Sequence, residues 1–564
     1  MKIYRFNSVL IIVMIVLWGS NDLHAQEIAK ADTASKAMVV AAHPEAVKVG
    51  IDMIKQGGNA VDAAVAAAFL IGVVEPHASG LGGGGGMLIY LQENKSFEYI
   101  DYYMQSSLSP DSNYSRNDLY TPRSICIPGT PAGLLKAHTL YGKLPLEIIM
   151  QPSINIARNG FVVTENFYTN ILDKLDVITL HQETQELLFK DDFPIEIGDI
   201  LVNENLALVL EKLVSNGIDY FYRGEFANKA VQTIQDNGGY ITEEDFENYK
   251  PVVKKPVNIS YRGYDIFSSP PPQSGLTMLE ILNIFENSTS DKDSKKYWDL
   301  QNVHLFCEAS KRADIDRYSF LGDPSSIDVP ITGLLSQDYA NERFEDIDLT
   351  IIKYSNNLEI PAGNPLNYND NANMQKGEDD GHTTHISVVD TEGNAVSLTQ
   401  TLGLFFGSGF TSQGVIFNSA MSVFYKKPSP NHIAAGKRPL TTISPTIIMR
   451  DGELFSVLGT PGGGRIFNVV AQKIIELIDF KMSPTEVMKN PRFNVRFRSK
   501  YLSMENGFND NLLEKLSEMG YKIRHYSELD SYFGGVQLIY YDENLNEFIG
   551  VSDPRRDGGA FGTN

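Results

Sequence analysis

The residues with the clearest chemical potential lie where the character of the chain changes, next to position 383. Residues 361–382 are dominated by Asn, Asp, Gly, Pro and Met and end in Gly377-Glu378-Asp379-Asp380-Gly381-His382. Such a composition buries little apolar surface and predicts a mobile, exposed segment. Directly after it, Thr383 opens the β-branched run TTHISVVD, which predicts a strand. Glu392-Gly393-Asn394 then predicts a turn, and residues 395–401 predict a second strand.

A Thr-Thr pair at the start of a strand is by itself no more than a good strand former. Two glycine-rich stretches are equally ambiguous on their own. Gly82–Gly86 is a run of five glycines, but it lacks a following Gly-Lys-Ser/Thr and leads into the apolar strand Met87–Leu91. It therefore indicates close backbone packing rather than a phosphate-binding loop. Pro461-Gly462-Gly463 alone indicates only a tight turn.

Other residue types with catalytic potential match no reactive pattern. The ten histidines include no His-x-x-x-His and no cluster with ligand spacing, so the sequence predicts no metal and no cofactor. Cys126 and Cys307 match no metal spacing and are interpreted as buried thiols, and no Gly-x-Ser-x-Gly motif is present. His385 points to the same strand face as Thr383 and is interpreted as a satisfied core histidine. Asp553 and Arg555 predict a structural ion pair or turn.

The sequence predicts only some of the helices and strands that must hold these residues. Residues 36–75 are expected to be mostly helical, with Pro44 opening the first helix and Gly57-Gly58 separating it from the next. Residues 60–74 are almost wholly apolar and predict a helix that is buried all round. The middle of the chain, from about 129 to 356, alternates helix-like and strand-like stretches.

The composition and the first residues limit the class of protein to which this chain can belong. The 564 residues are 42% hydrophobic and carry a net charge of −22, which is globular and makes nucleic acid an unfavourable partner. Lys2 and Arg5 precede the apolar run Val9–Trp18, and Ala25 ends a short polar stretch. This is the layout of a secretory signal peptide over residues 1–25, too short to span a bilayer comfortably. The mature protein is expected to be secreted or periplasmic and free of the membrane once the signal peptide is removed.

Many blocks along the chain, in order, resemble the gamma-glutamyltransferase (gamma-glutamyltranspeptidase, glutathione hydrolase) family. They are Gly57-Gly58-Asn59-Ala60-Val61-Asp62-Ala63-Ala64, the Gly82 run, Gly129-Thr130-Pro131-Ala132-Gly133, the Thr383 hairpin, Lys437-Arg438-Pro439-Leu440, Ser444-Pro445-Thr446, Gly459-Thr460-Pro461-Gly462-Gly463-Gly464-Arg465 and Ser552-Asp553-Pro554-Arg555. The resemblance covers nearly the whole mature chain. It implies an N-terminal-nucleophile hydrolase with an α+β fold, a four-layer αββα sandwich.

The resemblance also implies that the precursor cuts itself between His382 and Thr383. The products would be a large subunit, residues 26–382, and a small catalytic subunit, residues 383–564, which stay interleaved. A threonine hydroxyl inside a chain is a poor nucleophile because no base is attached to it. Cleavage gives Thr383 an α-amino group, whose ordinary pKa of about 7.7–8.0 suits a general base.

Further roles carry over to positions that match the family's motifs. Thr401 is implied to be the hydrogen-bond partner of Thr383. The backbone of Gly462 and Gly463 is implied to form the oxyanion hole, where groups without side chains let N–H donors approach the substrate closely. Thr441 and Thr442, an altered form of the family's hydroxyl pair, and Gly463 are implied to bind substrate.

Four positions depart from the pattern that grips a γ-glutamyl head group. The family's arginine for the substrate carboxylate falls at Tyr103, and its asparagine two residues past the partner threonine at Gly403. The groups that bind the substrate ammonium fall at Ala420 and Val423. These side chains replace almost none of the hydration that an ammonium or carboxylate loses on binding. The segment of residues 425–436 is also short for this family, which predicts a truncated lid over the site.

Three interpretations remain open at this stage. The first is a self-cleaving hydrolase or transferase of γ-glutamyl compounds such as glutathione, a small-molecule amide or peptide. The second is the same machinery acting as an acylase on a different amide. The third is an uncleaved, inactive exported binding protein on the same scaffold.

Overall fold

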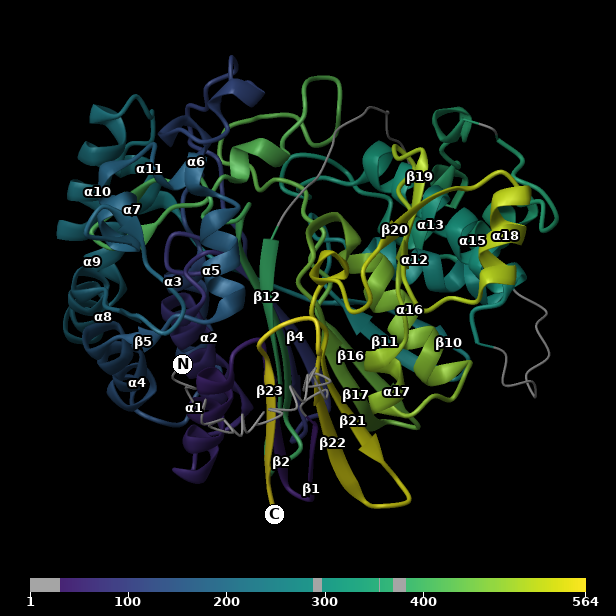
Figure 1. Cartoon of the computed structure of the whole chain (residues 1–564), viewed down its shortest axis with the longest axis horizontal. Helices are drawn as coiled ribbons and strands as arrows, with labels where there is room; N and C mark the ends of the chain where they lie inside the picture. Colours follow the sequence, from purple (N-terminus) through teal and green to yellow (C-terminus); the bar gives the residue numbers. More distant parts are fainter. Residues whose placement is uncertain (1–30, 288–296, 355, 369–381) are drawn as a thin grey trace, which may run out of the picture.

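The computed structural model describes residues 31–287, 297–354, 356–368 and 382–564. The predicted signal peptide and most of the predicted linker, residues 369–381, lie outside these ranges. Two seven-stranded sheets face each other at the centre, and helices cover both outer faces (Figure 1). The predicted four-layer αββα sandwich is confirmed.

Both large sheets are antiparallel throughout, and both take strands from either side of Thr383. The first sheet runs in the order β23 (Gly559–Thr563), β2 (Ala37–Ala41), β12 (His382–Val389), β13 (Ala395–Gly403), β3 (Gly84–Leu91), β4 (Ser96–Tyr102), β9 (Val252–Lys254). The second runs in the order β1 (Ala31–Ala34), β22 (Glu547–Ser552), β21 (Gln537–Asp542), β17 (Glu453–Gly459), β16 (Thr446–Arg450), β11 (Tyr264–Ser268), β10 (Val257–Tyr261).

Each outer face is covered by its own group of helices (Figure 1). Against the first sheet lie α1 (Pro44–Lys55), α2 (Ala60–Val74) and α3 (Thr130–Tyr141), with α4 (Leu146–Asn159), α8 (Glu204–Asn216) and α10 (Glu225–Asp236) further out. Against the second lie α12 (Gly275–Glu286) and α16 (Ile466–Ile478), with α13 (Leu300–Phe320), α15 (Gln337–Glu345), α17 (Pro484–Lys489) and α18 (Asp510–Glu518) nearby.

Three apolar cores separate the four layers, one under each helical layer and one between the sheets. Strand β12 shows how one strand serves two of them. Ile386 and Val388 enter the core beneath α2, whereas Val389 enters the core between the sheets. Successive side chains of a strand point to opposite faces, so odd-numbered positions of β12 face the second sheet.

The helix predicted over residues 60–74 is present with those bounds. A capping box begins it, since the Asn59 side chain accepts hydrogen bonds from the backbone N–H groups of Val61 and Asp62, and Asp62 accepts one from Asn59. Nearly every side chain of α2 is buried, as an all-round apolar helix requires.

The expectation of helix over residues 36–75 is wrong for its first part. Residues 37–41 form β2, which pairs with β12 on one side and β23 on the other. The run Met38-Val39-Val40 is buried on both faces, so it shows none of the alternation that identifies a half-exposed strand.

Candidate active site

The predicted hairpin is present, and it places Thr383 directly opposite Thr401. Strands β12 and β13 pair Thr383 with Thr401 and Thr384 with Gln400, but His382 pairs with Gly403. The pairing therefore skips Leu402, which is a bulge. Leu402 is held from outside the hairpin, since its N–H donates to Ala78 O (3.1 Å) and its carbonyl accepts from Ser419 N (3.0 Å). With this bulge, Thr383 near the start of β12 lies beside Thr401 near the end of β13.

Both threonines are almost fully enclosed, at 3% exposure each. Thr401 Oγ1 accepts a hydrogen bond from the N–H of Gly403 (2.9 Å). Its backbone carbonyl lies so close to Gly83 that a Cβ there would be 2.3 Å away. Similar approaches occur along the whole glycine run, which confirms that Gly82–Gly86 serves close backbone packing.

His385, two residues after Thr383, lies between the sheets as a satisfied core histidine, as predicted. Its Nδ1 is 2.8 Å from Thr399 Oγ1, and its Nε2 is 3.2 Å from Ser387 Oγ. Burial lowers the pKa of His385 to about 3, so it is neutral at physiological pH. Its ring rests on Gly459, where a Cβ would lie 2.2 Å from Cε1.

Hydrogen bonds of Ser397 join the two sheets, and the other predicted site segments lie at the same end of the sandwich as Thr383. Ser397 Oγ of β13 donates to Leu458 O (3.1 Å) and accepts from Thr446 N (3.0 Å). Beyond these hydrogen bonds β13 continues to Thr401, and β17 continues past Gly459 into the Pro-Gly-Gly turn. The segment that precedes β16, which holds Thr441 and Thr442, leaves the sheet at the same end.

The Gly462–Gly463 turn has a backbone that favours glycine. Gly462 has φ 138° and Gly463 φ 53°, both in the region that side-chain-bearing residues rarely adopt. A short 3-10 helix, Gly463–Arg465, follows and leads into α16. The N–H groups of the turn thus precede a helix N-terminus, the positive end of its dipole.

Thr441 and Thr442 are buried, and their segment is fixed through its backbone. Thr441 N donates to Pro272 O (3.0 Å), and Thr441 O accepts from Ser274 Oγ (2.6 Å). Thr442 O accepts from Ser444 Oγ (3.0 Å). These bonds use main-chain atoms, and neither side chain is needed to hold the segment in place.

The four positions that depart from the family pattern are also buried. Gly403 has φ 88°, and its Cα faces Ser419, whose Oγ would be 2.9 Å from a Cβ. Ala420 begins a 3-10 helix that ends at Val423. Tyr103 packs in the same apolar cluster as Ala420.

Asn418 organises this region, although the sequence does not single it out. Its amide nitrogen donates to Gly82 O and Cys126 O (both 2.8 Å), and its Oδ1 accepts from the N–H groups of Cys126 and Ala420 (both 3.0 Å). It therefore joins the glycine run, the segment before α3 and the Ala420 helix in one network.

Asp101, which lies close in the sequence to Tyr103, and Arg438, in the predicted motif at 437–440, have partners within the protein. Asp101 accepts from Lys254 Nζ (2.6 Å) and from the backbone N–H of Tyr103 (3.0 Å). Arg438 Nη2 donates to Lys250 O (2.6 Å), and its guanidinium lies over the Tyr249 ring, 5.6 Å from the centroid. Lys254 and Arg438 hold the pKa of Asp101 below its ordinary value against the effect of burial.

The remaining sequence interpretations are confirmed as structural features. Cys126 and Cys307 are buried free thiols, and burial raises the pKa of both, that of Cys307 to about 12. Arg555 pairs with Asp553 (3.2 Å) and Glu505 (2.5 Å), all three of them buried.

The chain is similar to known proteins over nearly its whole length. A family profile described as Gamma-glutamyltranspeptidase matches residues 46–563. The chain belongs to the gamma-glutamyltranspeptidase family. Its members are enzymes of the N-terminal-nucleophile hydrolase type, as the sequence resemblance implied.

Two relatives and one solved structure illustrate the range of this family. The glutathione hydrolase proenzyme of Escherichia coli (strain K12) is 36% identical over 551 residues, covering 93% of this chain and 91% of the relative. The acylase ACY 1 proenzyme of Pseudomonas sp. (strain SE83) is 32% identical and covers 88% of both chains. The crystal structure of cephalosporin acylase from Bacillus halodurans superposes with a TM-score of 0.84 at 26% identity, covering 94% of this chain and 96% of that one.

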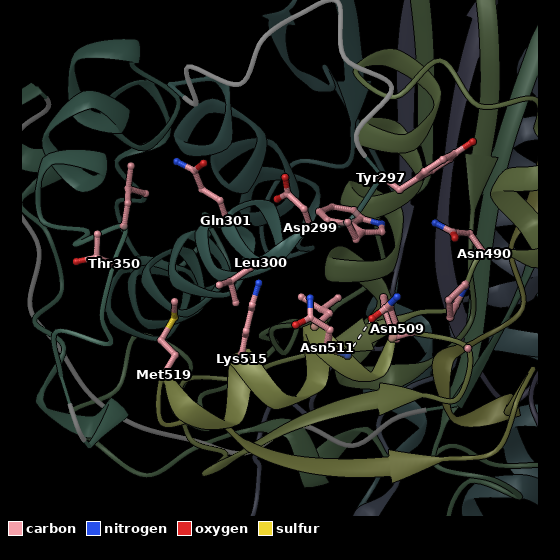
Figure 2. A pocket seen from close by; sticks show the side chains of 16 residues that line it. Tyr297, Asp299, Leu300, Gln301, Thr350, Asn490, Asn509, Asn511, Lys515 and Met519 are labelled. Atoms are coloured by element: carbon pink, nitrogen blue, oxygen red, sulfur yellow. Dashed lines mark hydrogen bonds between the residues drawn. The ribbon is translucent and has the colours of Figure 1, made fainter.

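A separate cavity of about 920 Å³ lies apart from the sites discussed above (Figure 2). It is lined from the start of α13, by Asp299 and Gln301 among others, and from α18, by Asn511 and Lys515. None of the predicted catalytic or substrate-binding residues lines it.

Within residues 31–287, 297–354, 356–368 and 382–564, every helix is too short or too polar to cross a bilayer. The same ranges hold no group of three or more His, Cys, Asp or Glu side chains suited to a metal ion.

Proposed function

We propose that the chain is a zymogen that is cut before Thr383 and then uses Thr383 as the nucleophile of an amide hydrolase and acyltransferase. The observation that carries the proposal is the pairing of Thr383 with Thr401 at the start of β12, at the end of the sandwich that also receives the Gly462–Gly463 turn. Membership in the gamma-glutamyltranspeptidase family supports the same roles.

In the first half of the reaction, the free α-amine of Thr383 takes the proton from its own Oγ as the oxygen attacks the amide carbonyl. A C–O bond forms, and the N–H groups of Gly462 and Gly463 stabilise the oxyanion. The C–N bond then breaks, the ammonium returns the proton to the leaving amine, and an ester on Thr383 remains.

In the second half, water or an acceptor amine attacks the ester carbonyl and gives a proton to the Thr383 amine. The ester C–O bond then breaks, the proton passes to Thr383 Oγ, and the carboxylic acid or the new amide leaves. Thr401 orients the Thr383 hydroxyl, and the segment of Thr441 and Thr442 holds the acyl group. The cycle is balanced without an oxidant, reductant or cofactor.

Two subunits, residues 26–382 and 383–564, would remain together after the cut. Both large sheets mix strands from the two segments, so separating them would break several ladders of hydrogen bonds. The Escherichia coli and Pseudomonas relatives are both named proenzymes, which supports a cleaved precursor. Export through the predicted signal peptide, residues 1–25, belongs to the same proposal.

The first candidate for the acyl donor is a γ-glutamyl-type amide such as glutathione. Family membership and the name of the Escherichia coli relative, glutathione hydrolase proenzyme, support it.

The second candidate is an acyl amide without the α-amino acid head group. Tyr103, Gly403, Ala420 and Val423 are buried and carry no formal charge, whereas Arg438 and Lys254 are already engaged with Asp101, Tyr249 and Lys250. An ammonium or carboxylate placed there would lose its hydration without compensation. Two relatives named acylases support this candidate.

Turnover of paired anilides tests both the chemistry and the donor. We expect the purified protein to release p-nitroaniline and Thr383→Ala to abolish the release, while Thr383→Ser retains part of it. We also expect glutaryl-p-nitroanilide, which lacks the α-amino group, to match or exceed γ-glutamyl-p-nitroanilide in kcat/KM. Strong, selective γ-glutamyl turnover would favour the first donor over the second, and a single uncut, inactive chain would favour the binding protein.

A further inference from the structure

The helix α2 is bound to the catalytic hairpin at both of its ends. At its start, Ala60 N donates to Asp390 Oδ2 (2.8 Å), where β12 ends. At its end, Thr384 Oγ1 donates to Glu75 Oε2 (2.9 Å), where β12 begins. A helix of 15 residues is about 22 Å long, and an extended chain from Thr384 to Asp390 is about 20 Å long. The helix therefore spans the length of β12 as a strut.

The turn that follows α2 holds β13 as well. Ala78 O accepts from the N–H of Leu402, the residue after Thr401, and His77 O accepts from Phe406 N (2.7 Å). The turn itself is closed on Glu75, whose carbonyl accepts from Ala78 N (3.0 Å) and Ser79 N (3.1 Å). The short segment 75–79 thus contacts both β12 and β13 next to the paired threonines.

We propose that Glu75 is a positioning residue for the nucleophile: its carboxyl group holds Thr384 and thereby fixes the start of β12 and the placement of Thr383. This role rests on the proposed function of Thr383. Thr384 points into the helical layer, away from the second sheet, so Glu75 acts on Thr383 through the backbone and does not contact the substrate.

The carboxyl group of Glu75 is fully buried, and few charges act on it. Burial raises the pKa of Glu75 from its ordinary 4.5 to about 7, against the positive charge of Arg556 and the hydrogen bond from Thr384, while Asp557 adds to the rise. His77 does not compete near neutral pH, because burial, with the charges of Arg556 and His43, lowers its pKa to about 3. Glu75 is therefore the group of this turn that titrates near neutral pH.

The ionised and neutral forms of Glu75 hold Thr384 differently. A carboxylate only accepts hydrogen bonds, so the Thr384 hydroxyl must donate to it, and bonds to a charged acceptor are the stronger ones. A neutral carboxyl group can donate instead and no longer attracts Arg556. Arg556 in turn lies within electrostatic reach of Arg465, at the end of the glycine turn. The ionised form is the one that positions the site.

The test is the pH dependence of kcat for anilide hydrolysis in the wild type, Glu75→Gln and Thr384→Val. In the wild type, both the Thr383 amine and Glu75 must be deprotonated, so log kcat falls with a slope near two below about pH 6. Glu75→Gln can still accept from Thr384 but does not titrate, so its slope is near one. The ratio of kcat for Glu75→Gln to kcat for the wild type then rises about tenfold between pH 8.5 and pH 6.

Thr384→Val tests the other partner of this hydrogen bond, with Thr384→Ser as its matched control. Removal of the hydroxyl lowers kcat about tenfold or more with little change in KM, and serine restores it. Thr399→Val removes a buried strand hydroxyl that contacts His385 and keeps the wild-type slope.

Failure of this proposal can be told from failure of the proposed function. If the wild type is uncut, or if Thr383→Ala leaves turnover unchanged, the proposed function fails first. If processing and dependence on Thr383 hold but Glu75→Gln follows the wild-type pH profile and Thr384→Val keeps the wild-type kcat, the role of Glu75 is overturned alone.

Discussion

The ring of His385 rests directly on Gly459, so β12 of one sheet and β17 of the other are in close contact at the end that holds Thr383. A Cβ at position 459 would lie 2.2 Å from Cε1 of the ring, well inside any permitted contact. His385 is two residues from Thr383, and Gly459 is three residues from Gly462. The contact therefore ties the strand of the proposed nucleophile to the strand that leads into the glycine turn.

Gly459→Ala is expected to push the two sheets apart at this end. Overpacking a close contact costs about 1–3 kcal/mol, so Tm should fall, and kcat should fall with it as the glycine turn moves away from Thr383. Thermal unfolding and anilide turnover measure the two effects. Gly559→Ala is the matched control, since a Cβ there meets its nearest neighbour at an ordinary 3.5 Å. Equal Tm values for the two variants would contradict this account of the contact.

Gly462→Ala is expected to lower kcat by about a hundredfold, the usual cost of one oxyanion donor. Alanine is strained at φ 138°, so the N–H groups of the turn should shift. Gly452→Ala also places alanine at a positive φ, 79°, in a turn where a Cβ meets no atom within 4 Å, and its kcat should stay at the wild-type value. The prediction fails if the two variants have the same kcat.

Val423→Asp is expected to change donor preference towards γ-glutamyl amides. A carboxylate at this buried position can pair with the substrate ammonium, and a hydrogen bond to a charged group contributes about 1.5–3 kcal/mol, which is roughly tenfold or more in relative kcat/KM. The measurement is the ratio of γ-glutamyl to glutaryl anilide turnover. Val423→Asn, similar in size but uncharged, should change the ratio much less, and an unchanged ratio in Val423→Asp would argue against this position as an ammonium contact.

Glu75→Gln is expected to stabilise the protein more at pH 8 than at pH 5, relative to the wild type. The pKa of Glu75 is raised by folding from 4.5 to about 7. Its favourable contribution is therefore fully present below pH 4.5 and is lost as the pH rises through 7, a loss of about 3 kcal/mol. Glutamine has no such dependence. Thermal unfolding of both proteins at pH 5 and pH 8 measures the change, and a difference in Tm that is independent of pH would refute it.

The hairpin of β12 and β13 could be predicted from the sequence to within about two residues. Its strands are rich in β-branched residues, and Glu392-Gly393-Asn394 marks the turn, so the local sequence is enough to predict both strands. The helix over residues 60–74 is equally clear, because an almost wholly apolar run follows the break at Gly57-Gly58.

Other features depend on packing between distant segments. Strand β2 is buried between β12 and β23, which comes from the far end of the chain, and no local alternation reveals it. The hydrogen bonds of Ser397 that join the sheets, with Thr441, Thr442 and the glycine turn at the Thr383 end, require two facing sheets. The sequence does not single out Glu75, because its hydrogen bond with Thr384 joins segments that are 309 residues apart.

The intact mass of the purified mature protein, together with its N-terminal sequence, shows whether the chain is cut before Thr383. We expect two chains held in one particle, the smaller one running from Thr383 to Asn564, and a single uncut chain for Thr383→Ala. A wild-type protein that hydrolyses anilides as one uncut chain, or whose smaller chain begins at any other residue, would contradict the proposed function.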